Sequence, residues 1–409
     1  MKLKKSPRNL LLLFQILTIG LLFLFNIDHL DNTFIYMALG LMILVYASNF
    51  LVPRISNGDD YIFLIVTMLM TIGIVTVFRI YPSGGVRQLL WVFVGIVAFY
   101  SSYYFIKHVK LLKNMFWIYI VLGYLFFILT LVFGRSDYGS VNWIHIGSIT
   151  IQLSELTKLL ILLAIAVYYT TPIKGLETKW KPYIFMAIIY SYVGLLLLQR
   201  DLGTAAIMMG IYSGTQFVYE KNRKMWKLNI LLMIVGALLG YAVFGHVRIR
   251  FAIWKDPWNI PEGYQILQSL FAIAAGGFFG TGLGEGHPYL IPKVQFDFIF
   301  PAICEEMGMF MGVAIILLFL LLVYRGMKIV LEQELTFYRV LALGVTLLFG
   351  IQAFVAIGGG IKFIPMTGIT LPFVSYGGSS MLSSFIALAF LQVASEVLPH
   401  DEEVVDEPK

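Results

Sequence analysis

The chain has 409 residues, of which 59% are hydrophobic, 15% are aromatic and only 13% are charged, with a net charge of +6. Soluble globular proteins are about 45–50% apolar and about 25% charged, so this composition leaves too little polar surface for a water-soluble particle. It excludes soluble, disordered, collagen-like and disulfide-scaffold proteins. Since one transmembrane helix needs about 20 apolar residues, twelve helices of roughly 240 residues would account for the apolar fraction.

Apolar stretches bounded by charges or by Gly and Pro turns predict an all-α polytopic membrane protein with about twelve transmembrane helices. The first stretch follows a basic segment as in a signal peptide, but no small-residue cleavage site follows it, so we expect an uncleaved helix. A single cysteine, Cys304, excludes an intramolecular disulfide. The predicted helices are 10–27, 33–52, 61–79, 87–106, 114–134, 155–171, 182–198, 201–219, 228–246, 299–324, 337–358 and 372–397.

A turn-rich segment at 53–60 divides the chain. It separates two N-terminal helices from the ten helices that follow. We therefore expect a two-helix unit over 1–56, a ten-helix core over 57–398 and an acidic tail over 399–409.

The basic loops predict the orientation, because cytoplasmic loops of membrane proteins carry an excess of Lys and Arg. We expect both termini in the cytoplasm, and the basic charge indicates membrane topology rather than a nucleic acid partner. The predicted cytoplasmic loops carry Lys107, Lys110 and Lys113; Lys174, Lys179 and Lys181; Lys221, Arg223, Lys224 and Lys227; and Arg325, Lys328 and Arg339.

Two predicted outer loops are too long to be simple turns. They are residues 134–154 and residues 247–298, the second of which lies between the ninth and tenth helices. Long ordered loops in compact proteins are usually functional. The second loop has six glycines between 276 and 286, which allow close approach to a phosphate or sugar but equally suit a flexible turn or tightly packed helix ends.

Ionisable residues at membrane depth are costly, so each is a functional candidate. Glu155 and Lys158 open the sixth helix on one face, three residues apart; the structural alternative is a helix-start pair with Ser154 as N-cap. Asp201 follows Arg200 between the seventh and eighth helices. It is a candidate for ligand binding and for the N-cap of the eighth helix, and the two roles are compatible.

Asp297 lies between Phe296 and Phe298, directly before the tenth helix. A carboxylate between aromatic side chains at the membrane interface should be partly desolvated, which raises its pKa and suits a general base near neutral pH. Glu306 follows about two turns deeper. The structural alternative is an aromatic belt with Asp297 as a helix cap. The six histidines have no metal-ligand spacing, and there is no P-loop or nucleophile elbow.

Several motifs occur in one order between about residues 60 and 397. They are Trp143-Ile144-x-Ile146-Gly147 with Gln152-x-Ser154-Glu155-x-x-Lys158; Gln199-x-Asp201-Leu202-Gly203-Thr204-Ala205; Arg250-Phe251, Asp256-Pro257, Gly263-Tyr264-Gln265 and Gly276-Gly277; Asp297-Phe298-Ile299-Phe300 with Glu305-Glu306-x-Gly308; and Pro365-x-Thr367-Gly368-x-x-Leu371-Pro372-x-x-Ser375-Tyr376-Gly377-Gly378-Ser379. Together they resemble the shape, elongation, division and sporulation (SEDS) family.

The chain also departs from the family pattern. Asn142, Leu153, Arg200 and Phe296 stand where the family usually has Arg, Pro, Pro and Thr, and the first two helices are additional to the usual ten. The resemblance therefore places the chain on a divergent branch of the family.

The resemblance implies a peptidoglycan glycosyltransferase of the bacterial cytoplasmic membrane, which polymerises lipid II into β-1,4 glycan strands on the outer face during elongation, division or sporulation. It implies lipid II, membrane lipids and a class B penicillin-binding protein, the cross-linking transpeptidase, as partners. The alternatives are a lipid II flippase and a non-enzymatic scaffold for that transpeptidase. The long outer loop with its carboxylate favours the enzyme, since a flippase needs no general base.

The implied reaction is attack by the acceptor GlcNAc 4-hydroxyl on C1 of the donor MurNAc, with undecaprenyl pyrophosphate leaving. Asp297 matches the essential aspartate of the family and is the candidate base. A divalent cation, Mg²⁺ or Mn²⁺, held by Asp297 or Glu306 with the pyrophosphate, is compatible with this chemistry. Candidate substrate-binding residues are Arg248, Arg250, Lys293, Trp143, Glu155, Lys158, Asp201 and Glu306, where Trp143 is a sugar or lipid platform or a member of an aromatic belt.

Overall fold

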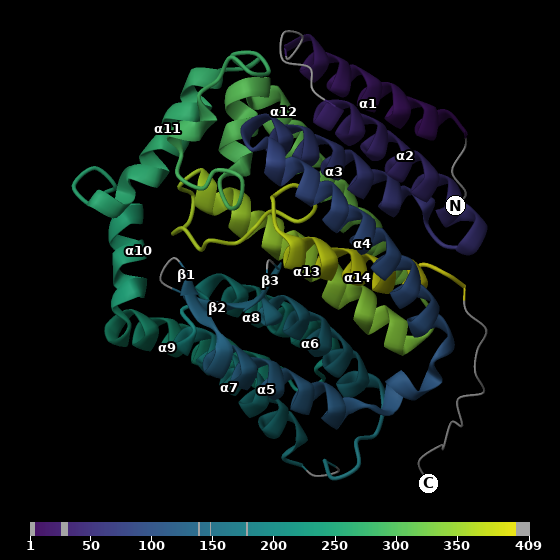
Figure 1. Cartoon of the computed structure of the whole chain (residues 1–409). Coiled ribbons are helices and arrows are strands. Elements are labelled where there is room, and N and C mark those ends of the chain that lie inside the picture. The colour runs from purple at the N-terminus through teal and green to yellow at the C-terminus, as the bar shows by residue number, and fades with distance from the viewer. Residues whose placement is uncertain (1–4, 26–31, 138–139, 148, 177–178, 398–409) are drawn as a thin grey trace.

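The computed structural model describes residues 5–25, 32–137, 140–147, 149–176 and 179–397, which form a nearly all-helical polytopic membrane protein (Figure 1). The predicted acidic tail at 399–409 lies outside the described residues. The α-helices are α1 (Lys5–Phe25), α2 (Asn32–Ile55), α3 (Asp60–Ile80), α4 (Pro82–His108), α5 (Phe116–Phe133), α6 (Leu153–Thr170), α7 (Lys181–Leu198), α8 (Leu202–Tyr219), α9 (Arg223–Val243), α10 (Gly245–Lys255), α11 (Tyr264–Gly276), α12 (Ile299–Glu332), α13 (Thr336–Gly360) and α14 (Gly378–Ala394).

Each of the twelve apolar stretches corresponds to a helix. Within the described residues, nine helices are long and apolar enough to cross a membrane, and the apolar parts of α1 and α14 are shorter. The count of twelve spans stays a prediction. The predicted start of the last helix at 372 was wrong, because the chain remains non-helical up to Gly377 and α14 begins at Gly378.

Both predicted long loops have secondary structure of their own. Residues 247–298 contain most of α10 and all of α11. The other loop contains an antiparallel sheet of β1 (Arg135–Asp137), β2 (Ser140–Ile146) and β3 (Ile149–Ile151), in which Ile144 pairs with Ile151. This sheet is a small exception to the predicted all-α fold, and it leads directly into the first turn of α6.

Contacts between distant segments define two ends of the helix bundle. At one end, Tyr376 N donates to Gln295 O (2.8 Å) and Arg250 Nη1 donates to Met366 O (3.0 Å). We call this end, which carries the sheet, α10 and α11, the loop end. At the other end, Trp117 Nε1 donates to Lys174 O (3.1 Å). We call it the basic end, because the loops with the Lys and Arg excess lie there.

Burial separates the helices into two groups. Most of α3, α6 and α13 is buried inside the protein, whereas α9 exposes nearly all of its apolar side chains. A helix that is apolar on all sides and exposed must face lipid. The polar residues of α6 and α13 therefore have to be satisfied by other protein groups, which places Glu155 and Lys158 in the interior.

The two N-terminal helices lie at one edge of the bundle, in purple in Figure 1. They pack on α3 and α4. Gln15 Nε2 donates to Thr71 Oγ1 (3.0 Å) and Asn49 Nδ2 donates to Thr67 Oγ1 (3.1 Å), so each helix is tied to α3 by a buried hydrogen bond. The division of the chain at 56 stays a prediction.

Candidate active site

The turn between α7 and α8 positions Asp201. Asp201 N donates to Leu196 O (2.9 Å) and Arg200 N donates to Leu197 O (3.1 Å), which is the Schellman pattern that ends many helices. Arg200 has a φ of 63°, which a proline cannot adopt. The Asp201 side chain then accepts a bond from Thr204 N (2.9 Å) and caps α8, as predicted.

The second carboxylate oxygen of Asp201 binds the start of α6. It accepts hydrogen bonds from Gln152 Nε2 and Ser154 Oγ, each at 3.2 Å. The predicted N-cap role of Ser154 was wrong, because Gln152 is the N-cap of α6 and Ser154 is turned towards Asp201 instead. Gln152 N donates to Ser379 Oγ (3.0 Å), so this cluster also reaches the start of α14.

From the first turn of α6, Glu155 forms a buried ion pair with Lys158. Lys158 Nζ lies 2.9 Å from both carboxylate oxygens and donates to Gln352 Oε1 of α13 (3.1 Å). Ser383 Oγ of α14 donates to Glu155 (2.7 Å), and Gln352 Nε2 donates to Thr370 O (3.1 Å). The pair is therefore a three-helix junction whose members are almost fully satisfied, and not a solvated pair at a helix start.

Asp297 lies in the turn that precedes α12, and this turn is fixed by the segment before α14. The Phe296 ring packs edge-on against Tyr376 at 5.5 Å. A Cβ at Gly368 would lie 3.9 Å from Asp297 Oδ2. The helix-cap role offered as an alternative for Asp297 was wrong, because Phe298 is the N-cap of α12 and no side chain caps this helix.

Two cations act on the Asp297 carboxylate. Desolvation raises its pKa to about 6, and the charges of Lys293 and Arg250 oppose that shift. Arg250 also interacts electrostatically with Asp201, while one of its Nη atoms is held by Met366 O. Arg250 therefore connects the two carboxylates, Asp201 and Asp297, at the loop end of the bundle. We call Asp297, Lys293, Arg250 and Asp201 the Asp297 cluster.

Glu306 belongs to a second polar cluster. Its carboxylate lies 3.4 Å from Arg79 of α3, and Arg79 Nη2 donates to Gly284 O (2.6 Å). The neighbouring Glu305 accepts a bond from His287 N (2.8 Å). Both Glu306 oxygens are buried, with Arg79 as the charged partner of this carboxylate. This cluster ties the glycine-rich segment to α3 and α12.

Two glycines of the second loop, Gly276 and Gly280, serve packing. A Cβ at Gly276 or Gly280 would collide with the backbone carbonyl of Cys304 or Glu306. Gly308 has a φ of 78° and interrupts α12, and the loop backbone pairs with the interrupted turn. The sequence did not decide between a ligand-binding role, a flexible turn and tightly packed helix ends. At these positions the glycines are part of tightly packed helix ends, where they approach the protein backbone.

The remaining predicted residues are not part of these clusters. Arg248 is exposed on α10 and Trp143 is half-buried in β2. The sequence interpretation also left residues out. Gln352 and Arg79 were missed, although an isolated Gln or Arg in an apolar helix is a signal for a polar partner. Ser379 was quoted in the C-terminal motif without a role, and Ser383 was missed, because serines in apolar helices are common and the partners of these two are distant in sequence.

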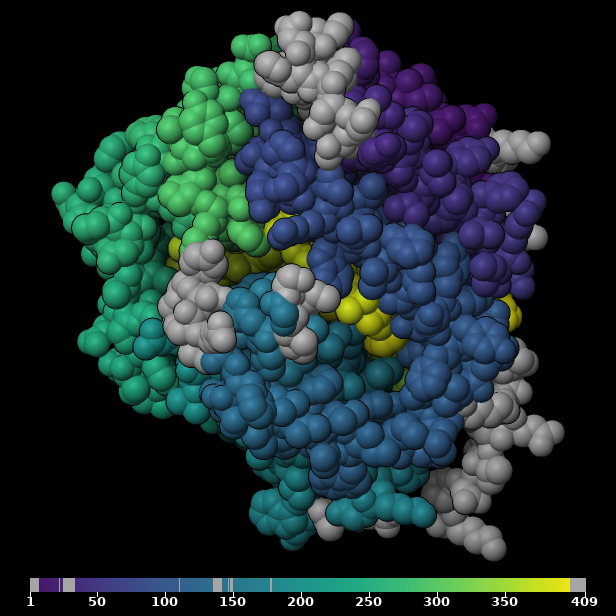
Figure 2. Space-filling view, in the orientation of Figure 1, coloured from purple at the N-terminus to yellow at the C-terminus, as the bar shows by residue number. Residues whose placement is uncertain are grey.

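The face of the molecule in Figure 2 is hollowed between its blue and blue-green elements, and yellow residues from the C-terminal part of the chain lie at the bottom of the hollow. The C-terminal segment is also the one that contacts Asp297 and Arg250. Within the described residues, no group of three or more His, Cys, Asp and Glu side chains is arranged to hold a metal ion. The chemistry that this arrangement offers is proton transfer by a desolvated carboxylate next to two cations.

Comparison with known proteins defines the class. Residues 60–398 match the FtsW, RodA and SpoVE family model, described as "Cell cycle protein". This match covers most of the chain, so the protein belongs to that family, the SEDS family. The matched range begins at α3.

Individual relatives agree with this assignment. The peptidoglycan glycosyltransferase RodA of Mycobacterium tuberculosis is 30% identical, over 81% of this chain and 77% of the relative. The stage V sporulation protein E of Bacillus subtilis is 32% identical, over 82% and 96%. A chain from a solved peptidoglycan synthase complex that coordinates polymerization and crosslinking superimposes with a TM-score of 0.69 at 26% identity, over 82% of this chain and 97% of that one.

Proposed function

We propose that this protein is a peptidoglycan glycosyltransferase that polymerises lipid II into β-1,4 glycan strands. The observation that carries the proposal is the position of Asp297: a desolvated carboxylate with a pKa of about 6, close to Lys293 and Arg250, in a member of a family whose relatives are named for this activity. With that pKa, Asp297 is mostly ionised at pH 7 and remains basic enough to accept a proton.

In the proposed reaction, Asp297 accepts the proton of the acceptor GlcNAc 4-hydroxyl as the oxygen attacks C1 of the donor MurNAc. The bond from C1 to the pyrophosphate oxygen breaks, and undecaprenyl pyrophosphate leaves. Attack from the opposite face inverts the α-linked donor and gives the β-1,4 bond. Such a displacement requires a base on the acceptor side and positive charge on the leaving-group side.

Arg250 and Lys293 are the proposed stabilisers of the leaving pyrophosphate. Arg250 interacts electrostatically with both Asp201 and Asp297, which keeps its guanidinium at the reacting carboxylate. Asp201 in turn is held by Gln152, Ser154 and α8, so it fixes the position of Arg250 electrostatically rather than by direct chemistry. The Glu155–Lys158 junction holds α6 in place, and the preceding residue of α6, Ser154, contacts Asp201 of the Asp297 cluster.

A divalent cation would need oxygen ligands from the substrate. Asp297 is a single carboxylate that faces two cations, and Glu306 is paired with Arg79. One carboxylate with pyrophosphate oxygens is a common Mg²⁺ arrangement. Loss of activity in chelator, with recovery on addition of Mg²⁺ or Mn²⁺, would indicate such an ion.

We propose that the basic end faces the cytoplasm and the loop end faces outward, with both termini inside. The Lys and Arg excess in the loops of the basic end supports this orientation. It places Asp297 on the side of the membrane where lipid-linked sugar is consumed.

We further propose that the protein works with a cross-linking transpeptidase, a class B penicillin-binding protein. The similar chain comes from a complex that couples polymerization to crosslinking. A lipid-facing groove of about 210 Å³ between α12 and α13, whose lining includes Gly350 and Gly358, would accept apolar side chains from a transmembrane helix of that partner. Small residues allow such close helix packing in a membrane.

The test is polymerisation by the protein alone. Purified protein is incubated with lipid II in detergent, without any other glycosyltransferase, and glycan length is read on a gel. Polymer is the expected product. Transfer of lipid II across vesicle membranes without polymer would select a flippase. If the protein neither polymerises nor transports lipid II, but increases crosslinking by an added transpeptidase, it acts as a scaffold.

A further inference from the structure

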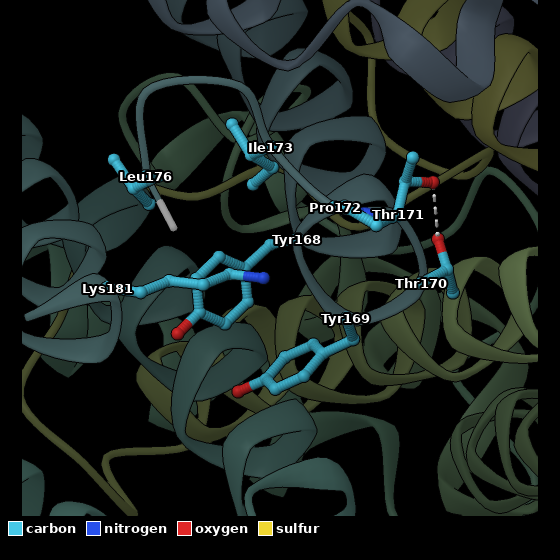
Figure 3. A pocket seen from close by; sticks show the side chains of 8 residues that line it. All are labelled: Tyr168, Tyr169, Thr170, Thr171, Pro172, Ile173, Leu176 and Lys181. Carbon is cyan, nitrogen blue, oxygen red and sulfur yellow. Dashed lines mark hydrogen bonds between the residues drawn. The ribbon is translucent and has the colours of Figure 1, made fainter. Parts of the chain in front are cut away.

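A second site candidate lies far from Asp297. A cavity of about 410 Å³ opens at the basic end, where α6 ends and α7 begins (Figure 3). It is at the opposite end of α6 from Glu155, and none of the proposed catalytic residues contributes to it. Its walls are Tyr168, Tyr169, Thr170, Thr171, Pro172, Ile173, Leu176 and Lys181.

Polar groups gather in this cavity. Lys181 Nζ lies 4.8 Å from the centre of the Tyr168 ring, which stacks on Phe185 at 4.1 Å. Figure 3 shows the Tyr168 and Tyr169 hydroxyls directed to the same side. In the part of the chain that the structure describes, neither hydroxyl hydrogen-bonds to another protein group. The hydroxyls of Thr170 and Thr171 lie 3.5 Å apart. The Thr170 hydroxyl also donates to Ala166 O (2.6 Å), so the two threonines are occupied within the protein. One ammonium and two tyrosine hydroxyls therefore remain as polar groups for a ligand in a preformed cavity.

The surroundings of the cavity are basic. The segments 171–181 and 219–227 together contain seven Lys and Arg residues and two Glu residues. Of these acids, Glu220 at the end of α8 interacts electrostatically with Lys181. Two carboxylates cannot neutralise seven cations, so the cavity favours an anionic ligand.

The cavity also lies at the level of a membrane surface. Trp117, Trp180 and Tyr183 are exposed beside it, with 42%, 57% and 45% of their surfaces accessible. Trp and Tyr are enriched where a bilayer meets water. Ile184 on α7 is exposed next to them and continues the apolar surface towards the bilayer core.

We propose that this cavity binds the head group of an anionic phospholipid from the leaflet at the basic end. Lysine and hydroxyl donors suit phosphate oxygens, and basic pockets between transmembrane helices are known binding sites for anionic head groups. The exposed aromatic and aliphatic side chains offer contacts to acyl chains, which a free phosphate lacks. Assignment to the cytoplasmic leaflet rests on the proposed orientation, whereas the binding itself does not rest on the proposed activity.

Lipid binding to the full-length protein tests this proposal without an activity assay. Phosphatidylglycerol is titrated into delipidated protein in detergent, and bound lipid is counted by native mass spectrometry. Lys181→Ala is expected to weaken binding about fivefold, the effect of one cation near a membrane surface. Lys224→Ala is the matched control, because Lys224 is an exposed lysine of the same end that does not line the cavity; it should change affinity less than twofold.

A second variant guards against misfolding. Tyr169→Phe removes one hydroxyl and preserves charge and ring packing, so a measurable loss of affinity with an unchanged melting temperature is expected. If Lys181→Ala and Lys224→Ala weaken lipid binding equally, the lipid is attracted by the general positive charge of this end, and the proposed binding site is wrong. Equal affinity for phosphatidylcholine would overturn the anionic specificity. Inorganic phosphate that competes at the affinity of the lipid would assign the cavity to a soluble ligand instead.

Discussion

Replacing Asp297 with Asn is the most informative perturbation of the proposed mechanism. The amide keeps the size of the side chain but cannot accept a proton at neutral pH. General-base catalysis is worth typically 10²–10⁴-fold, so glycan synthesis should fall at least about a hundredfold. The acid limb of the wild-type kcat/KM profile should lie near pH 6, the raised pKa of Asp297.

The same pKa predicts the effect on stability. It rises from 3.8 to about 6 in the folded protein, so between these pH values the folded state binds more protons and stability falls as pH rises. The full shift corresponds to about 3 kcal/mol, and roughly 1–3 kcal/mol remains once the partial exposure of the side chain is considered. Asp297→Asn removes this cost. The variant should therefore melt at a higher temperature than wild type at pH 7.5, with the difference vanishing near pH 4.

The assay combines polymerisation per folded molecule with melting of the same preparation in detergent. Glu285→Gln is a matched control, since Glu285 is an exposed carboxylate of the same loop outside the Asp297 cluster, and it should retain activity. Lipid II binding should survive in Asp297→Asn, because Arg250 and Lys293 are retained. An Asn variant that polymerises at a near wild-type rate would refute the assignment of the base. An Asn variant that is inactive and less stable than wild type would refute the desolvation argument.

Three further predictions concern the rest of the fold. Lys158→Met leaves the buried Glu155 carboxylate without its cation and should cost about 3–5 kcal/mol; adding Glu155→Gln should recover part of this loss, and a double variant as unstable as the single one would contradict the pairing argument. A cysteine that replaces Glu285 should react with an impermeant reagent added outside intact cells, whereas a cysteine that replaces Lys224 should not. The reverse pattern would mean that the protein has the opposite orientation in the membrane. Deletion of 1–55 should lower the melting temperature, because α3 loses two buried hydrogen bonds, but should preserve polymerisation; an inserted, folded and inactive truncation would mean that the first two helices serve catalysis.

The sequence alone predicted the helices well, because each must satisfy its backbone internally and present apolar side chains to lipid. It also indicated Asp201 as the cap of α8, since this role depends on residues three positions apart. Its errors were local. The structural alternative with Ser154 as a cap was wrong. The last helix was predicted to begin six residues early, because the apolar side chains of 372–377 suggest a helix whether the segment spans the membrane or lines a site.

Only the tertiary structure decided which polar residues meet. Lys158 reaches Gln352, and Glu155 reaches Ser383, only when α6, α13 and α14 pack together. Arg250 comes close to Asp297 only when α10 returns to the segment before α14. Helical periodicity places residues on faces of one helix but does not say which faces meet. The raised pKa of Asp297 has the same origin, because desolvation is the sum of all neighbours that exclude water. The sequence indicated the helices and the candidate base, and packing determined the partners of Asp297 and its proton affinity.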